Sequence, residues 1–421
     1  MTGSSSRSRS FSSGSNHQLP KTSNVSRRQH LVVVATLLVG LCVLHGAFIF
    51  EPGRLTDEHF YEPAIEKAVA GGSPYEVPGF LYPPSFARAG SVLHEMLGTL
   101  GSRYTLRAVN LIGLLFILWF TVERGIRAGR RSIATSVASS GDATPPTWLL
   151  IALPVALLWT PGVGFGVFAG NFSFLVGAVA LLGIWHADRR PILSGTLLAA
   201  TLLAKPFMAG ALPLFLLPTP RTRDSQTLFQ RLHTRRVAAA LLAGVLAVAA
   251  LWVDRHELVH MLAAEPPDLA KKRSMSIFRI ARELGFGELR LPLFAAATSI
   301  LCVGFWGRLA DRRHLLVATM VAVPLTTLVV WGHTLVLFFP AAAMAIGSWL
   351  ARRRAAGLVG LWAGTPEDRL ETVVVLGGTA LLLFAHPGGF ADKPGIVQAL
   401  LLVPPLLAPV ALGAYWFWAE E

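Results

Sequence analysis

The sequence carries little charge and almost no cysteine. Charged residues occupy 14% of its 421 positions, against roughly a quarter in soluble domains. Its two cysteines, Cys42 and Cys302, both lie inside apolar runs, and this spacing supports neither a disulfide framework nor a zinc site. A soluble domain held together by disulfides or zinc is therefore not expected.

Motifs that bind nucleotides are also missing. The chain has no Rossmann glycine fingerprint and no Walker loop, so it gives no support to a soluble nucleotide-binding domain. It also lacks an Asp-x-Asp motif, which argues against a metal-bound nucleotide-sugar donor. We expect neither a metal nor a cofactor.

What the chain has instead is apolar sequence. Hydrophobic residues make up 53% of it, and runs of about 18 apolar residues, long enough to cross a bilayer core, recur along it. In lipid such runs are helical, because few other structures satisfy the backbone there. The net charge of +13 comes from basic clusters between the runs, which is the topology pattern of a membrane protein and gives no support to nucleic acid binding. The sequence predicts an all-α, polytopic membrane protein.

We predict about twelve transmembrane helices, several of them short. The Ser-rich, basic residues 1–29 are expected to form a disordered cytoplasmic tail, residues 30–350 a membrane core, and residues 351–421 the C-terminal transmembrane helices. The first apolar run lacks a small-residue cleavage site and is predicted to remain as an anchor. The predicted spans are 30–50, 105–122, 147–160, 171–187, 191–204, 206–219, 236–253, 291–307, 314–332, 334–350, 371–387 and 395–418.

The basic residues predict the orientation in the plasma (inner) membrane. With the N-terminus inside, every tight basic cluster except 271–273 falls on the cytoplasmic side, as the positive-inside rule requires. The loops 51–104 and 254–290 are then the two large outer ones. Within the first loop, residues 60–70 and 85–100 show the helical spacing of interfacial helices.

The first outer loop opens with acids and a tyrosine, in Asp57-Glu58-His59-Phe60-Tyr61. An inverting glycosyl transfer needs a side chain that takes the proton of the acceptor hydroxyl, and Asp57 is the candidate for that base. The plainer interpretation is a pair of solvated loop acids. Further along, Tyr75 and Tyr82 are flanked by prolines and offer rings on which a sugar can stack.

Two ionisable residues lie between apolar runs, where such residues are functional candidates. Lys205 either snorkels to an interface or binds a lipid phosphate as a point charge. His333 either belongs to the active site or is a hydrogen-bonded histidine at a helix junction. If Lys205 holds a carrier phosphate, it must lie at the outer end of the membrane, near Asp57.

The second predicted outer loop carries a basic patch with two serines among its cations. The patch is formed by Lys271, Lys272, Arg273, Arg279 and Arg282, with Ser274 and Ser276. Such side chains would hold the phosphate of a polyprenyl-phosphate donor and stabilise the charge that develops on leaving. The alternative is a general attraction to anionic lipids.

Four blocks of the sequence, in order, resemble the polyprenyl-phosphate-mannose-dependent mannosyltransferases, which are membrane enzymes of the C-type glycosyltransferase fold. The third block departs from the family at its Asn and Gln positions, and the fourth has Thr334 in place of a second histidine. The blocks are Asp57 to Pro84 with its Gly-x-Pro-Tyr and Tyr-Pro-Pro, Gly170-Asn171-Phe172-Ser173 leading to Lys205-Pro206, Arg273 to Arg279, and Trp331-Gly332-His333-Thr334 with Pro340.

The resemblance implies that Asp57 is the catalytic base and His333 a second catalytic polar group. It also implies that Lys205 and the basic patch bind the phosphate. The residues expected to bind substrate are Glu58, Tyr61, Tyr75, Tyr82, Asn171, Lys205, Lys272, Arg273, Ser274 and Arg279.

We therefore expect a glycosyltransferase that moves a hexose, mannose by resemblance, from a polyprenyl-phosphate carrier to a lipid or glycan acceptor outside the cytoplasm. Its partners would be this donor, an unidentified acceptor and the membrane lipids. The alternative is a transporter or flippase of lipid-linked saccharides, with Lys205 and His333 on its pathway. Inverted repeats commonly accompany such folds, and no internal repeat is visible in the sequence.

Overall fold

A computed structural model describes most of the chain. The described residues are 27–51, 53, 55–80, 82–136, 147–221, 227–263, 276–327, 332–358, 360–384 and 395–420, with some side chains inside these ranges left out. Residues 1–26 of the predicted tail lie outside them, and its last three residues already belong to the first helix.

Within those ranges the protein is mostly helical and has no strand, only an isolated bridge between Pro218 and Leu232. The elements of the first half are α1 (Arg27–Ile49), α2 (Glu58–Val69), η1 (Pro74–Glu76), α3 (Pro84–Ser136), α4 (Thr147–Leu158), α5 (Pro161–Ala169), α6 (Ser173–His186), α7 (Pro191–Ala204) and η2 (Pro206–Leu216). Those of the second half are α8 (Leu228–Arg231), α9 (Thr234–Val253), α10 (Arg255–Ala263), α12 (Ile277–Glu283), η3 (Gly287–Leu289), α13 (Arg290–Gly304), α14 (Arg312–Thr326), η4 (Gly332–Phe338), α15 (Phe339–Ala355), α16 (Pro366–Phe384) and α17 (Gly395–Glu420).

Four of the described helices are long and apolar enough to cross a membrane. They are Arg27–Ile49, Pro84–Gly125, Thr234–Val253 and Thr334–Arg354. The pair α4 and α5 passes the same test together, with a bend of 54° at the break before Pro161. Further apolar helices of 10–17 residues accompany them, and the whole set has the composition of a membrane-embedded protein. The predicted total of twelve spans is not established by these lengths and stays a prediction.

Residues 51–104, predicted as the first outer loop, fold as expected into helices, but the second of these helices continues into the next predicted span. The predicted segment 60–70 is α2. The predicted segment 85–100 joins the span 105–122 in α3, with a break at Gly98, where φ is +68° and ψ is 177°. Glycine adopts this backbone conformation without a Cβ penalty, so the two parts of α3 can meet at an angle there.

The predicted span 206–219 takes a different form. After α7 ends, η2 is an 11-residue 3₁₀-helix that begins at Pro206 and contains Pro213. Proline donates no backbone hydrogen bond and opposes a continuous α-helix, which accounts for the shorter element. Lys205 lies at the junction, in extended backbone.

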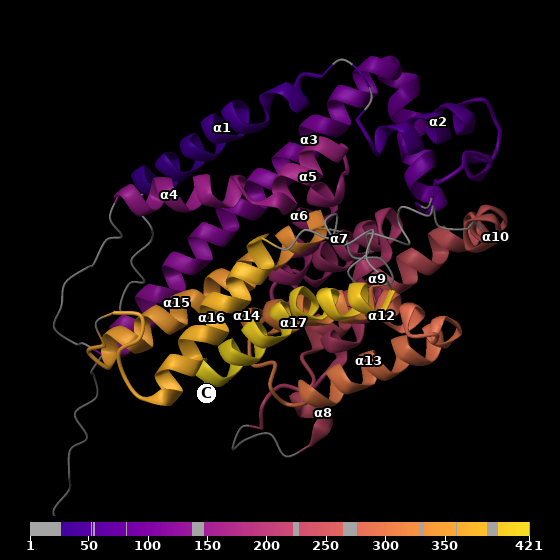
Figure 1. Cartoon of the computed structure of the whole chain (residues 1–421). Coiled ribbons are helices and arrows are strands. Elements are labelled where there is room, and N and C mark those ends of the chain that lie inside the picture. Colours follow the sequence, from indigo (N-terminus) through magenta and orange to yellow (C-terminus); the bar gives the residue numbers. More distant parts are fainter. Residues whose placement is uncertain are drawn as a thin grey trace, which may run out of the picture.

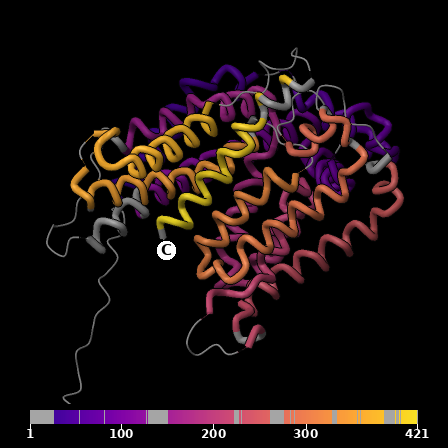
Figure 2. Tube along the Cα trace, turned by 60° about the horizontal axis from the view of Figure 1, so that its bottom comes forward, coloured from indigo at the N-terminus to yellow at the C-terminus, as the bar shows by residue number. Residues whose placement is uncertain are grey.

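The helices pack so that α3 forms the long axis of the molecule. Figure 1 shows α3 crossing the view diagonally, with α2 near its first end and α15 beside its second half. Helix α10 lies on the same side of the view as α2 (Figure 1). Figure 2 shows the C-terminal helices α15, α16 and α17 packed side by side. Helix α3 also packs against α6.

Candidate functional site

The segment that carries Asp57 is fixed to the end of α5. The backbone N–H of Asp57 donates to the carbonyl of Ala169 at 2.7 Å, and the hydroxyl of Tyr61, one turn into α2, donates to the carbonyl of Gly170 at 3.1 Å. Asp57 stands at the N-cap position of α2, but its side chain makes no capping bond. The carboxylate is therefore available for other partners.

Gly170 makes this contact possible. Its φ is +68°, and a Cβ built on it would lie 2.9 Å from the Cβ of Leu55 and 3.1 Å from a carboxylate oxygen of Glu58. Both the left-handed backbone and the close approach favour glycine. The turn brings the next residue, Asn171, beside Asp57.

Asn171 is the hub of the site. Its side-chain amide donates a short hydrogen bond to the carboxylate of Asp57, and at 3.4 Å it also approaches the hydroxyl of Tyr82. Its side-chain oxygen accepts from the ammonium of Lys205 at 2.8 Å and from the backbone N–H of Ser173 at 2.9 Å. One buried asparagine thus joins an acid, a phenol and an amine that come from three separate parts of the chain.

Lys205 points toward this cluster and keeps a donor position open. Its ammonium donates to Asn171 and, at 2.5 Å, to the hydroxyl of Ser173. An ammonium has three donors, so among the described residues one is left for a ligand. The nitrogen also lies 5.3 Å and 5.5 Å from the ring centroids of Tyr82 and Phe172, within the range of cation–π attraction.

An aromatic cluster forms the floor of the site. Phe172 stacks on Phe86 with parallel rings 4.1 Å apart, and its centroid lies 4.8 Å from that of Tyr82 and 6.0 Å from that of Tyr61. Tyr75 joins the cluster through its hydroxyl, which donates to the carbonyl of Tyr82 at 2.7 Å. Of the two Pro-flanked tyrosines, Tyr82 therefore lies beside Asp57 and Asn171, and Tyr75 supports Tyr82 from behind.

Burial shifts the acid–base behaviour of this cluster. Desolvation raises the pKa of Asp57 above its ordinary value of 3.8; the hydrogen bond from Asn171 and the charge of Lys205 oppose that shift, and Glu58 adds to it. Burial also raises the pKa of Tyr82 well above 10, and the charge of Asp57 adds to the effect. A carboxylate with a raised pKa is a better proton acceptor, and Tyr82 stays a neutral phenol beside it.

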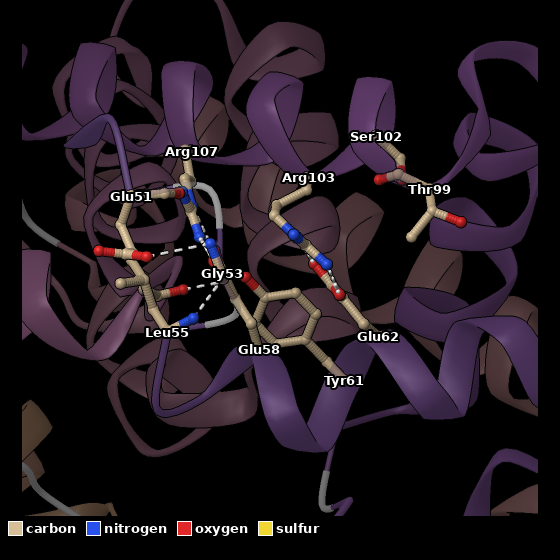
Figure 3. A network of polar contacts seen from close by, with 11 residues as sticks. Glu51, Gly53, Leu55, Glu58, Tyr61, Glu62, Thr99, Ser102, Arg103 and Arg107 are labelled. Carbon is tan, nitrogen blue, oxygen red and sulfur yellow. Dashed lines mark hydrogen bonds and ion pairs between the residues drawn. The ribbon is translucent and has the colours of Figure 1, made fainter. Parts of the chain in front are cut away.

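Glu58 is committed to a different network, shown in Figure 3. Its carboxylate, which is fully buried, accepts from the guanidinium of Arg107 at 2.6 Å and 2.5 Å and from the backbone N–H of Leu55 at 2.6 Å. Arg107 also donates to the carbonyls of Glu51 at 2.5 Å and Gly53 at 2.7 Å. This arrangement fixes the loop leading to Asp57, and the substrate-binding role of Glu58 stays a prediction.

A second buried ion pair lies one turn later in α2 and one turn earlier in α3. Arg103 of α3 donates to the two carboxylate oxygens of Glu62 in α2 at 2.6 Å and 2.8 Å. Figure 3 shows the two arginines on one face of α3 and the two glutamates on the facing side of α2. Two bidentate pairs thus fix α2, and with it Asp57, against α3.

Residues 51–104 and 254–290, the two loops that the sequence predicts to be outer ones, meet beside the site. The guanidinium of Arg88 in α3 pairs with the buried Asp254 next to α10, and the hydroxyl of Ser73 donates to the carboxylate of Glu257 in α10 at 2.5 Å. Burial, followed by the charges of Glu257 and Asp254, raises the pKa of Tyr75. The start of the second loop is therefore attached to the first loop at the Asp57 end.

The remaining predicted residues are not placed in this cluster. Lys272, Arg273 and Ser274 lie outside the described residues. For His333 only the backbone is described, in η4. Arg279 is buried on α12, an element that packs against α17 and α14. Within the described part of the chain, no three His, Cys, Asp or Glu side chains are grouped to hold a metal.

Sequence reasoning missed the residue that positions Asn171. Asn110 of α3, 5% exposed, donates to the carbonyl of Asn171 at 2.8 Å and accepts from the backbone N–H of Leu175 at 3.0 Å. It satisfies the polar groups at the start of α6, where backbone N–H groups lack helical partners. The sequence did contain a signal for Asn110, because it is a polar residue inside the apolar run 105–122, and polar residues within membrane spans are functional candidates.

The other end of α6 collects arginines. The 14 residues of α6 separate its two ends by about 21 Å. At the far end the guanidinium groups of Arg124 and Arg312 lie 3.7 Å and 3.9 Å from the ring centroid of Trp185. The fully buried Arg236 pairs with Asp188 and donates to the carbonyl of Leu309 at 2.8 Å. The basic clusters of several connections therefore converge opposite the Asp57 end.

Comparison with known proteins adds no assignment. No protein-family model matches the chain, and no curated protein matches it either.

Proposed function

We propose that the protein is an inverting membrane glycosyltransferase that uses a polyprenyl-phosphate sugar as donor, with Asp57 as the catalytic base. The expected sugar is a hexose, mannose by resemblance, and the acceptor is a glycolipid or glycan. The observation that carries the proposal is the Asp57–Asn171–Lys205 cluster. It holds a carboxylate of raised pKa and a lysine with an open donor position on opposite sides of one asparagine side chain.

The reaction would use the two charged groups in complementary roles. The acceptor hydroxyl attacks the anomeric carbon and gives its proton to Asp57 as the new C–O bond forms. The bond between that carbon and the phosphate oxygen breaks, and the polyprenyl phosphate leaves with the electron pair and one additional negative charge. The ammonium of Lys205 offsets that charge, which is greater in the transition state than in the bound donor. Atoms and charge balance without a metal.

The aromatic floor and the arginine-rich end agree with this assignment. The rings of Tyr82 and Phe172 beside Lys205 offer apolar faces for a sugar. If the arginine-rich end is cytoplasmic, as the positive-inside rule requires, then the Asp57 end faces outward. We propose this orientation, with the C-type glycosyltransferase fold and about twelve spans, as part of the same hypothesis.

The test is sugar transfer by the purified protein in lipid vesicles. Synthetic polyprenyl-phosphate-mannose is supplied with a set of glycolipid acceptors, and the transferred sugar is measured. Asp57→Asn should lower the rate by about 10²–10⁴. Glu76→Gln, which changes an exposed acid of the same loop, should not. Undiminished transfer by Asp57→Asn would overturn the base assignment, and use of a nucleotide sugar without a lipid carrier would overturn the donor. Passage of an unchanged lipid-linked saccharide across the membrane would favour the transporter alternative.

A further inference from the structure

A pocket of about 500 Å³ opens on the segment that carries Asp57, between the end of α1, the start of α2 and the end of α5. The mechanism proposed above uses none of its lining side chains. Among the described residues that line it there is no lysine or arginine. They are Phe48, Glu51, Leu55, Thr56, His59, Phe60 and Phe168.

The pocket combines exposed rings with hydrogen-bonding groups. The rings of Phe48 and Phe168 meet edge to face with centroids 5.3 Å apart, and both side chains are partly open, at 36% and 45% exposure. Glu51 and His59 are exposed at the same pocket, and Thr56 adds a hydroxyl. Apolar walls with a few polar groups are the usual composition of a small-molecule site.

This composition selects among the molecules that reach a membrane surface. A phosphate would meet the carboxylate of Glu51, which repels it. A polyprenyl chain would desolvate Glu51 and His59 without giving them a hydrogen bond, which is costly. A neutral saccharide fits both the aromatic and the polar groups of the lining. Its C–H faces pack on the rings, and its hydroxyls form hydrogen bonds with the carboxylate, imidazole and hydroxyl groups.

The pocket is preformed and joined directly to the site. Arg107 fixes the carbonyls of Glu51 and Gly53, so one wall is held by the buried network of Figure 3. Thr56 precedes Asp57 in the chain, and Phe168 precedes Ala169, whose carbonyl accepts from the backbone of Asp57. A ligand in the pocket therefore contacts residues that are direct chain neighbours of Asp57 and of Ala169.

We propose that this pocket binds a neutral saccharide unit of the acceptor and so holds the acceptor next to Asp57. The acceptor part of this inference rests on the proposed function. The pocket's preference for a neutral sugar rests on its lining alone.

Two phenylalanines at the end of α1 give a matched test. Phe48 lines the pocket, whereas Phe50, two residues on and 70% exposed, does not. Binding of methyl hexosides and hexobiosides to the full-length protein, in vesicles free of glycoside detergent, is measured by saturation-transfer NMR. Wild type and Phe50→Ala should bind a probe from this set. Phe48→Ala and His59→Ala should each weaken binding at least about tenfold, or about 1.4 kcal/mol. His59 is exposed, so its variant keeps the test valid if Phe48→Ala folds poorly.

Several results would overturn the inference. They are equal weakening by Phe48→Ala and Phe50→Ala, no binding of any probe to wild type, and displacement of the probe by inorganic phosphate or polyprenyl phosphate. In the transfer assay, the pocket variants should raise the KM for acceptor and leave the KM for donor unchanged. If no transfer occurs but Phe48→Ala loses probe binding, the proposed function fails and the saccharide site stands. If transfer occurs with an unchanged acceptor KM in both pocket variants, the pocket assignment fails alone.

Discussion

The charged side chains at the two ends of helix α6 differ in how fully they are paired within the protein. At the far end Arg236 is fully buried against Asp188 and a backbone carbonyl, and Arg124 and Arg312 lie over the ring of Trp185. At the near end Lys205 keeps a donor position open among the described residues, beside the half-buried Asp57.

The difference gives a way to distinguish two kinds of charged side chain in a membrane protein: those that stabilise the fold and those that act in a reaction. Charges that hold a fold are compensated by partners within the protein, because an uncompensated buried charge is costly. Charged groups that take part in a reaction keep hydrogen-bonding positions that stay unoccupied until a substrate binds. By this criterion we assign a role in stabilising the fold to the arginine end, and we propose the Asp57 end as the reactive one.

The largest expected effect comes from breaking one buried ion pair at each end. Arg107→Met leaves Glu58 buried without its partner and should lower the free energy of unfolding by about 3–5 kcal/mol. It should also lower the transfer rate of the folded fraction, because the loop that leads to Asp57 loses its anchor. Arg236→Met should lower stability by a similar amount and leave that rate unchanged. Thermal unfolding and specific transfer rate of both variants check this.

A double variant separates the two roles of Arg107. Arg107→Met with Glu58→Leu removes both charges, and such replacements recover stability because the desolvation cost of the pair disappears. Transfer should remain low, since the carbonyls of Glu51 and Gly53 stay unanchored. Full recovery of transfer would show that the network serves stability alone.

The next effect concerns the open donor of Lys205. Lys205→Met keeps much of the stem volume but removes a charge-assisted contact, so donor affinity should fall by about 1.5–3 kcal/mol, or roughly ten- to a hundred-fold. The control is Lys67→Met, which breaks only an exposed ion pair with Glu76. Binding of polyprenyl phosphate to both variants is the measurement. Equal affinities would leave Lys205 with a structural role only, through its hydrogen bonds to Asn171 and Ser173.

The pH dependence tests the acid at the same end. Because burial raises the pKa of Asp57, kcat/KM should fall with decreasing pH in a limb that lies above pH 3.8. Asn171→Ala removes the hydrogen bond that lowers this pKa, so its limb should move to higher pH. The pKa of Asp57 is higher in the folded state than in the unfolded state. As the pH rises above 3.8, ionisation of Asp57 therefore favours the unfolded state. Asp57→Asn should therefore be at least as stable as wild type at neutral pH. A limb that Asn171→Ala leaves in place would contradict the account.

The smallest effect is expected at the arginine end. Arg124→Gln removes the cation–π contacts with Trp185 and Phe120. It also removes the ion pair with Glu123, which keeps Arg127 as a partner. The free energy of unfolding should fall by about 1–2 kcal/mol. Sugar transfer should be unaffected, because the contact with Trp185 lies about one length of α6 from Asp57. A loss of transfer at full stability would remove the distinction between the two ends.

Much of this comparison was visible in the sequence. Long apolar runs predicted the helical membrane fold, and the arginine clusters predicted that basic residues would gather at one end. The first outer loop supplied Asp57, Tyr75 and Tyr82, and the Lys-Pro pair marked Lys205. These signals are local, because each depends on a few neighbouring residues.

The partners of those residues could not be predicted in the same way. Glu58 stands next to Asp57 in sequence, yet it turns to Arg107, 49 residues away, instead of to the site. Asn110 and Asn171 are joined only because α3 packs on α6. The stop of α7 at Lys205 and the 3₁₀ form of η2 depend on prolines whose effect on helix length is not fixed by hydropathy.

The most direct test of the central claim is an experimental structure of the protein with polyprenyl-phosphate-mannose bound, in the Asp57→Asn variant to prevent turnover. The account predicts that the phosphate lies within hydrogen-bond distance of the Lys205 ammonium, with the anomeric carbon facing the side chain at position 57. A phosphate seated instead among Arg124, Arg312 and Trp185, at the other end of α6, would contradict it.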